Sequence, residues 1–128
     1  MIADTTFLID LGRGDSGAFK KLNELKAQKE SLAITAVTTF ELFQGASGLN
    51  DKELKFFSKL TDNALVIPIE HETAKIAGVI RSQLKKRGIQ LEALDCLVAS
   101  IVIVGRDVLL TRNVKDFSRI EGLRIETY

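Results

Sequence analysis

Four carboxylates lie far apart in the sequence at positions where chemistry could use them: Asp4, Glu41, Asp95 and Asp116. Asp95 is the least ordinary, since its neighbours three and four residues away on a helix are the apolar Leu91, Val98 and Ala99. A carboxylate among apolar groups loses hydration, so its charged form is costly unless a cation lies beside it. No Lys or Arg lies within one helical turn. Either Asp95 lies in water at an open edge, or the fold brings a cation to it.

Composition limits the classes of function. With 128 residues, 45% hydrophobic and 27% charged, the chain is expected to be a single globular domain spanning residues 1–128. The net charge of +1 excludes a global basic field for nucleic acid, so charge recognition must be local. The single Cys96 excludes an internal disulfide and a cysteine-based metal site, and reads as a small core residue. No signal peptide or membrane span is visible, so a cytoplasmic protein is expected.

Hydrophobic periodicity and turn residues predict alternating strands and helices. The expected strands are Met1–Ala3, Leu32–Thr35, Leu65–Ile69, Val108–Leu110 and Leu123–Glu126. The expected helices are Thr5–Leu11, Ser16–Gln28, Thr38–Ala46, Asn50–Leu60, Glu72–Arg87 and an apolar helix that runs from Leu91 and stops at Gly105. Thr38 with Glu41, and Asn50 with Glu53, have capping-box spacing. The alternation predicts an α/β fold, an α/β/α sandwich around a mostly parallel sheet of 4–5 strands.

The carboxyl ends of parallel strands meet at one edge of a sheet, where sites in such folds collect. Asp4 directly follows the first strand, and Glu41 lies in the helix after the second. Asp95 lies near the start of the helix before the fourth strand, and Asp116 ends the polar loop (residues 111–116) after it. A cluster of carboxylates without a compensating Lys is a site for a hard divalent cation.

Each of these residues also has a purely structural interpretation. Asp4 could cap the following helix, Glu41 could complete the capping box with Thr38, and Asp116 could begin a turn or helix. The run Lys85–Arg87 reads as a solvated helix end. Four unrelated structural roles would not explain why all of these acids are expected at the same edge of the sheet.

Several motifs together resemble the PIN-domain family, most closely the VapC-type toxins of toxin–antitoxin pairs. Ile2–Asp10 (IADTTFLID) is similar to the family's first strand and helix. The later motifs are Thr38-x-x-Glu41-Leu42-x-x-Gly45, Asp95–Ala99 and Leu109–Phe117, followed by a C-terminal strand within Ile120–Tyr128. The four motifs occur in order over the whole chain.

This resemblance implies a metal-dependent endoribonuclease that forms a homodimer and is inhibited by a small antitoxin protein. It implies one or two Mg²⁺ or Mn²⁺ ions held by the four carboxylates, with the side chains of Thr6, Thr111 and Asn113 orienting them. Family members often carry an acid at the position of Asn113. Either Asp116 supplies the fourth carboxylate, or Asn113 acts as a neutral ligand.

Basic and aromatic residues near the acids are candidates for contacts with substrate and partner. Arg112 and Lys115 lie in the loop after the fourth strand and could hold an RNA phosphate. Four aromatic residues gather between residues 38 and 60: Phe40, Phe43, Phe56 and Phe57. They form either a wide buried stripe or an apolar groove beside the acids for an inserted antitoxin helix.

Two other classes of function stay open. A receiver or phosphatase-type phosphoryl-transfer domain would also bind Mg²⁺, but needs a phosphoacceptor Asp after a central strand, and Leu65–Ile69 offers none. A catalytically inactive PIN-fold binding module would use only the fold, which the intact Asp4, Glu41 and Asp95 disfavour. Labelling by a phosphodonor would support the first class, and metal-stimulated RNA cleavage would exclude the second.

Overall fold

The central sheet has five strands, all parallel, in the order β3-β2-β1-β4-β5. The computed structural model describes residues 1–128. The strands are β1 (Ile2–Ala3), β2 (Ala33–Thr35), β3 (Leu65–Ile67), β4 (Leu109–Leu110) and β5 (Ile125–Glu126). β1 is the middle strand, because Ile2 pairs with Ala33 on one side and with Leu109 on the other. The predicted parallel sheet is confirmed, and β3 is an edge strand that ends before Pro68.

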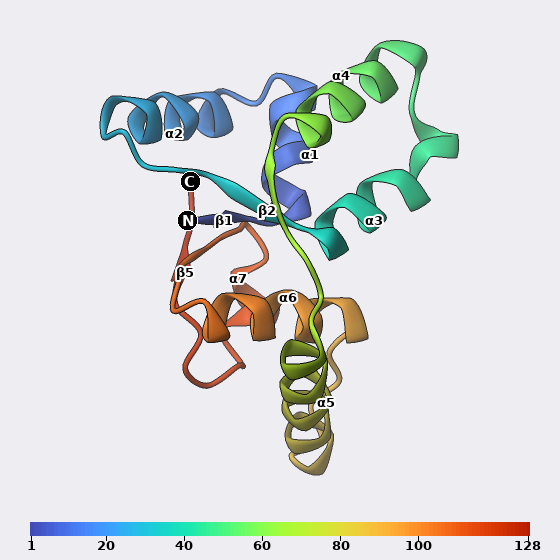
Figure 1. Ribbon diagram of the computed structural model, residues 1–128, viewed down its shortest axis with the longest axis vertical. Helices are drawn as coiled ribbons and strands as arrows, with labels where there is room; N and C mark the ends of the chain where they lie inside the picture. Colours follow the sequence, from blue (N-terminus) through green and yellow to red (C-terminus); the bar gives the residue numbers. More distant parts are fainter.

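Helices cover both faces of this sheet (Figure 1). They are α1 (Thr5–Arg13), α2 (Ser16–Ala27), α3 (Ala36–Gln44), α4 (Asp51–Asp62), α5 (His71–Lys86), α6 (Ala93–Val104) and α7 (Val114–Phe117), with a 3-10 turn at Ala46–Gly48. None of them combines the length and the apolar content needed to span a bilayer. The α/β/α sandwich expected from the sequence is therefore the fold.

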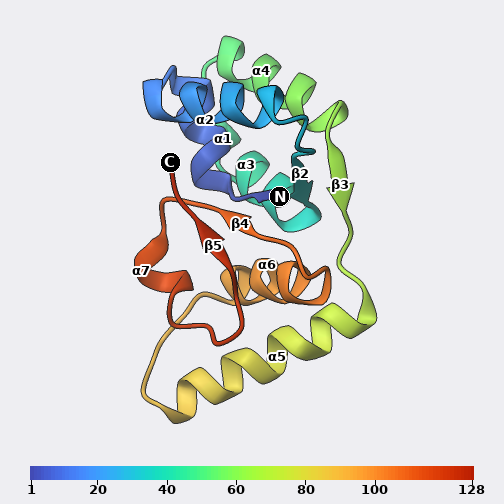
Figure 2. The same ribbon diagram turned by 90° about the vertical axis from the view of Figure 1, so that its left-hand side faces the viewer.

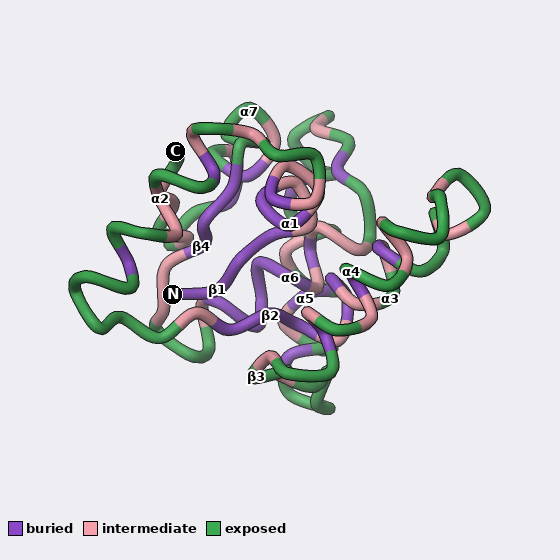
Figure 3. Tube along the Cα trace, turned by 90° about the horizontal axis from the view of Figure 1, so that it is seen from above, coloured by how far each residue is buried: buried purple, intermediate pink, exposed green.

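Two apolar cores, one on each face, hold the three layers together. One core includes Phe7 of α1, Leu25 of α2 and Phe57 of α4. The other includes Leu84 of α5 and Val102 of α6. Figure 2 shows α5 running alongside α6 on the outer side of the second layer. Figure 3 shows β1, β2 and β4 as buried strands, whereas the edge strand β3 is largely exposed. Burial of apolar surface on both faces of the sheet stabilises the strands, although each is only two or three residues long.

Two local predictions are wrong. The capping box of Thr38 with Glu41 does not form, because α3 begins at Ala36 and the Thr35 hydroxyl accepts the Thr38 N–H at 3.0 Å. The last residue of β2 thus caps the helix, and the Glu41 side chain is free for other contacts. The polar stretch 111–116 is not all loop, since α7 forms one helical turn that buries Phe117.

The second capping box, at the start of α4, is confirmed. The Asn50 side chain accepts the Glu53 N–H, and the Glu53 carboxylate accepts the Asn50 N–H, both at 2.9 Å. These bonds satisfy N–H groups that the first turn of a helix otherwise leaves without partners.

The four clustered phenylalanines separate into one core residue and three surface residues. Phe57 is 3% exposed, whereas the exposed fractions of Phe40, Phe43 and Phe56 are 55%, 37% and 38%. Phe57 packs against α1 at Gly12, where an added Cβ would lie 2.7 Å from its ring. The close approach of α4 to α1 therefore depends on a glycine at position 12.

Replacing Phe57 or Phe56 by Ala should distinguish the core ring from the surface ring. Phe57→Ala is expected to lower the free energy of unfolding by about 3–5 kcal/mol, because it leaves a cavity in the core. Phe56→Ala, a matched substitution at the half-exposed ring, is expected to cost less than about 1.5 kcal/mol. Urea denaturation measures both values. Equal losses in the two variants would contradict the packing described.

Candidate active site

The sheet brings acidic side chains from four helical segments toward one edge. Asp4 directly follows β1 and is 5% exposed, and Glu41 lies on α3 after β2. Asp95 lies in the first turn of α6, and Asp116 lies on α7 after β4. Asp95 and Asp116 line one cavity, and the negative charges of Asp4, Glu41 and Asp116 all act on Asp95.

Asp4 is held by hydroxyl donors from two chain segments. The Thr111 hydroxyl donates to Oδ2 of Asp4 at 2.7 Å, and the Thr6 hydroxyl donates to the same oxygen at 3.1 Å. Thr111 is fully buried and also accepts the Asn113 N–H at 3.0 Å. Asp4 occupies the cap position of α1, but its side chain makes no capping bond. The network instead joins the ends of β1 and β4, and it leaves Oδ1 of Asp4 without a protein donor.

Glu41 is anchored in the same manner. The Thr5 hydroxyl donates to Oε2 of Glu41 across 36 residues of sequence. Burial raises the pKa of the Glu41 carboxyl, the Thr5 hydrogen bond opposes that rise, and the charge of Asp4 adds to it. No buried side-chain oxygen or nitrogen in the structure lacks a hydrogen-bond partner. The second oxygens of Asp4 and Glu41 are therefore reachable by solvent or a ligand.

Asp95 has the most perturbed carboxyl group of the site. Its pKa is raised from 3.8 to about 6, first by partial burial and then by the negative charges of Asp4, Glu41, Asp116 and Glu92. No Lys or Arg forms an ion pair with it. The fold thus surrounds Asp95 with like charge and gives it no ion-pair partner, an arrangement that favours the binding of a cation.

The donor set fits a small divalent cation. The carboxylates supply the oxygen ligands that Mg²⁺ and Mn²⁺ prefer, and two of them are anchored through one oxygen while the other oxygen is free. As the side chains stand, no three of them converge closely enough to enclose an ion. Mg²⁺ does not require such a cage, because it commonly binds through one or two carboxylates and completes its shell with water and substrate phosphates.

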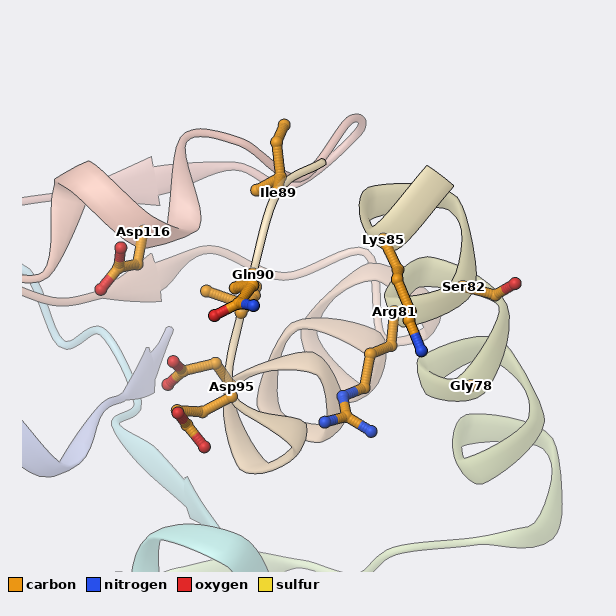
Figure 4. A pocket seen from close by; sticks show the side chains of 10 residues that line it. Gly78, Arg81, Ser82, Lys85, Ile89, Gln90, Asp95 and Asp116 are labelled. Atoms are coloured by element: carbon orange, nitrogen blue, oxygen red, sulfur yellow. The ribbon is translucent and has the colours of Figure 1, made fainter. Parts of the chain in front are cut away.

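An open cavity of about 840 Å³ is lined by two of the four carboxylates, Asp95 and Asp116. Figure 4 shows Asp95 and Asp116 on one side of it, with Arg81 and Lys85 of α5 on the other. The two basic residues were missed from the sequence, where Lys85 reads as part of a solvated helix end. Their spacing of four residues on one helix was the available signal.

Arg112 already has partners within the chain. Its guanidinium contacts Asp15 at 2.7 Å and Asp10 at 3.1 Å, and it lies 4.8 Å from the centroid of the Tyr128 ring. The Arg112 N–H donates to the Thr6 hydroxyl at 3.2 Å, which ties the cluster to the carboxylate network. These contacts give Arg112 a structural role, and its contact with RNA phosphate stays a prediction.

The other predicted residues of this segment lie on or beside α7. Lys115 is exposed and forms no ion pair, whereas Asp116 contacts Arg119 at 3.9 Å. Asn113 is half-buried, and its backbone rather than its side chain bonds to Thr111. Of the two candidates for the fourth ligand, Asp116 is the one that lines the cavity beside Asp95.

The raised pKa of Asp95 has a measurable consequence for stability. The folded protein binds this proton more tightly than the unfolded chain does, so ionised Asp95 destabilises the fold above about pH 6, and this cost disappears as the pH falls toward 4. Without divalent metal, Asp95→Asn is expected to raise the free energy of unfolding at pH 7.5 by roughly 1–2 kcal/mol, after allowance for solvent screening.

Urea denaturation of wild type and variant at several pH values measures this difference. It should shrink between pH 6 and pH 4, while Asp62→Asn, at the exposed end of α4, should change little at any pH. A destabilised Asp95→Asn at pH 7.5 would contradict the electrostatic description.

Comparisons with known proteins agree with this geometry. A PIN domain model matches residues 1–123. Ribonuclease VapC1 of Methanocaldococcus jannaschii is 30% identical, covering 100% of this chain and 86% of that protein. VapBC-1 from nontypeable Haemophilus influenzae superposes with a TM-score of 0.83 at 26% identity, covering 98% of this chain and 96% of the other. A toxin–antitoxin complex from Klebsiella pneumoniae superposes with a TM-score of 0.73 at 27% identity, covering 95% of this chain and 93% of the other. The chain belongs to the PIN domain family.

Proposed function

We propose that the protein is a metal-dependent endoribonuclease, the toxin of a VapBC-type toxin–antitoxin pair. The observation that carries the metal dependence is the cluster of carboxylates around Asp95, in which only Asp116 has a basic partner, Arg119 at 3.9 Å. The ribonuclease and toxin assignments rest on relatives of this fold that are named as VapC ribonucleases or toxin–antitoxin complexes. The proposed assembly is a homodimer that acts in the cytoplasm and is silenced by a small antitoxin.

In this proposal Asp4, Asp95 and Asp116 hold one or two Mg²⁺ or Mn²⁺ ions, and Glu41 completes the set. Such an ion would activate water at neutral pH and stabilise the charge that develops on the phosphate oxygens. Thr111 and Thr6 hold the Asp4 carboxylate in one orientation, and Thr5 does the same for Glu41. Each anchored carboxylate then presents its free oxygen, because its other oxygen is engaged.

The phosphoryl-transfer alternative is not favoured. It requires an acceptor Asp after a central strand, and β3 is an edge strand that leads into Pro68 without an acid. The only carboxylate that directly follows the central strand is Asp4, and the second acid that such a domain carries two residues later is absent, since Thr6 stands there.

Removing one charge from the site should abolish cleavage while the fold stays intact. Asp4→Asn and Asp95→Asn are each expected to slow cleavage of a mixed RNA pool in Mg²⁺ or Mn²⁺ by more than about 100-fold, since both are proposed to bind the ion directly. Mn²⁺ should raise the melting temperature of wild type by mass action, and it should raise the melting temperatures of the two variants by a smaller amount.

The matched control is Asp62→Asn, which should keep both cleavage and the metal-induced shift in melting temperature. Wild-type cleavage should stop in EDTA. Undiminished cleavage in EDTA, or equal shifts in all four proteins, would disprove the assigned metal site.

The antitoxin is proposed to cover the exposed aromatic surface beside the acids. Phe40, Phe43 and Phe56 are exposed on α3 and α4, and Glu41 and Phe57 of the same two helices line a cavity of about 260 Å³. An amphipathic segment of a partner would bury these rings.

Phe56→Ser is therefore expected to weaken binding of the cognate antitoxin by roughly tenfold or more, as for a buried interface aromatic. RNA cleavage by the free protein should stay unchanged. Val79→Ser, at an exposed apolar residue on α5, is the control for both measurements. Unaltered antitoxin affinity in Phe56→Ser, measured by calorimetry, would place the antitoxin on another surface.

A further inference from the structure

The cavity beside the acidic cluster has two walls of opposite charge. Asp95 and Asp116 form one wall, at the start of α6 and on α7. Arg81 and Lys85 form the other wall, and both are exposed side chains of α5 (Figure 4). Neither basic side chain forms an ion pair with an acid of this chain. Their charges are therefore available to a ligand that enters the cavity.

The geometry of α5 presents this basic wall as one continuous face. Gly78, Arg81, Ser82 and Lys85 all line the cavity, and their spacing of three, four and seven residues places them on one side of a helix. Ala77 and Leu84 belong to the core, and α5 packs against α6. At Gly78, an added Cβ would meet no atom within 4 Å. The wall is therefore open along the helix and fixed in position relative to Asp95.

A polyanionic substrate needs such a wall. The carboxylates repel every phosphate of an RNA strand, and a bound metal ion offsets that repulsion only at the phosphate it contacts. The phosphates on either side must be attracted by other groups. Arg81 offers a planar fork for two phosphate oxygens, and Lys85 offers a flexible point charge one turn along the helix.

We propose that Arg81 and Lys85 bind the phosphate backbone of single-stranded RNA immediately beside the cleaved bond, and so direct the strand across the acidic cluster. This inference rests on the proposed ribonuclease function and names its substrate contact. The contacts are to backbone phosphates, so they recognise a polyanionic strand and not a base sequence.

The test is equilibrium binding of a fluorescein-labelled, twelve-nucleotide RNA without secondary structure, in EDTA so that no strand is cut. The double variant Arg81→Ala/Lys85→Ala is expected to bind roughly tenfold more weakly than wild type at low salt. The slope of log affinity against log salt should become shallower by about 1.4, since each phosphate contact on a single strand contributes about 0.7. Arg81→Lys/Lys85→Arg keeps both charges and should retain the wild-type slope.

The matched control is Lys75→Ala/Lys86→Ala, which removes two charges from the same helix at exposed residues outside the cavity. It should leave affinity and slope near the wild-type values. Equal losses in the two alanine pairs would overturn the proposal, because they would show a diffuse effect of charge. Unchanged RNA affinity in Arg81→Ala/Lys85→Ala, or absence of RNA binding by wild type, would overturn it as well.

Cleavage in Mn²⁺ separates this proposal from the function on which it rests. If the protein cuts RNA, Arg81→Ala/Lys85→Ala should raise KM and change kcat little, since the strand is bound less tightly but the acids are intact. An unchanged KM would contradict the proposal while cleavage itself supports the function. If wild type binds RNA in a salt-dependent manner but does not cleave it, the result would contradict the proposed function and still support the phosphate contact.

Discussion

The central physical constraint on this structure is the repulsion among carboxylates that the parallel sheet gathers at one edge. Because every strand runs in the same direction, the residues that follow β1 and β4 reach the same edge. There the charges of Asp4, Glu41 and Asp116 add to partial burial and raise the pKa of Asp95 to about 6. The two apolar cores on the faces of the sheet hold these charges together. A site that disfavours its own ionisation is one that gains from a divalent cation.

Threonine hydroxyls decide how these carboxylates are presented. Thr111 and Thr6 both donate to Oδ2 of Asp4, and Thr5 donates to Oε2 of Glu41. Hydroxyl donors add no positive charge, so they orient the carboxylates without neutralising them. A Lys or Arg in their place would have neutralised the site. The basic residues lie instead across the cavity on α5, or pair with Asp10 and Asp15 in the case of Arg112.

Local patterns predicted the elements and the acidic edge, because periodicity and strand ends are properties of neighbouring residues. The contacts that complete the site join distant residues. Thr111 lies 107 positions from Asp4, and only the family resemblance pointed to its role, whereas Thr5 lies 36 positions from Glu41 and was missed. The predicted capping box at Thr38 was wrong, because Thr35 is both the last residue of a strand and the N-cap of the next helix. Which ring of Phe56 and Phe57 turns inward depends on space at Gly12, in a different helix.

The central claim is that the carboxylate cluster binds a divalent cation. Anomalous X-ray scattering from crystals equilibrated with Mn²⁺ tests it most directly, because it locates the ion without assuming any activity. We expect an anomalous peak about 2.2 Å from carboxylate oxygens of Asp4 and Asp95. The Asp95→Asn variant should show no peak at this position. A peak only at other surface carboxylates, or none at saturating Mn²⁺, would contradict the claim.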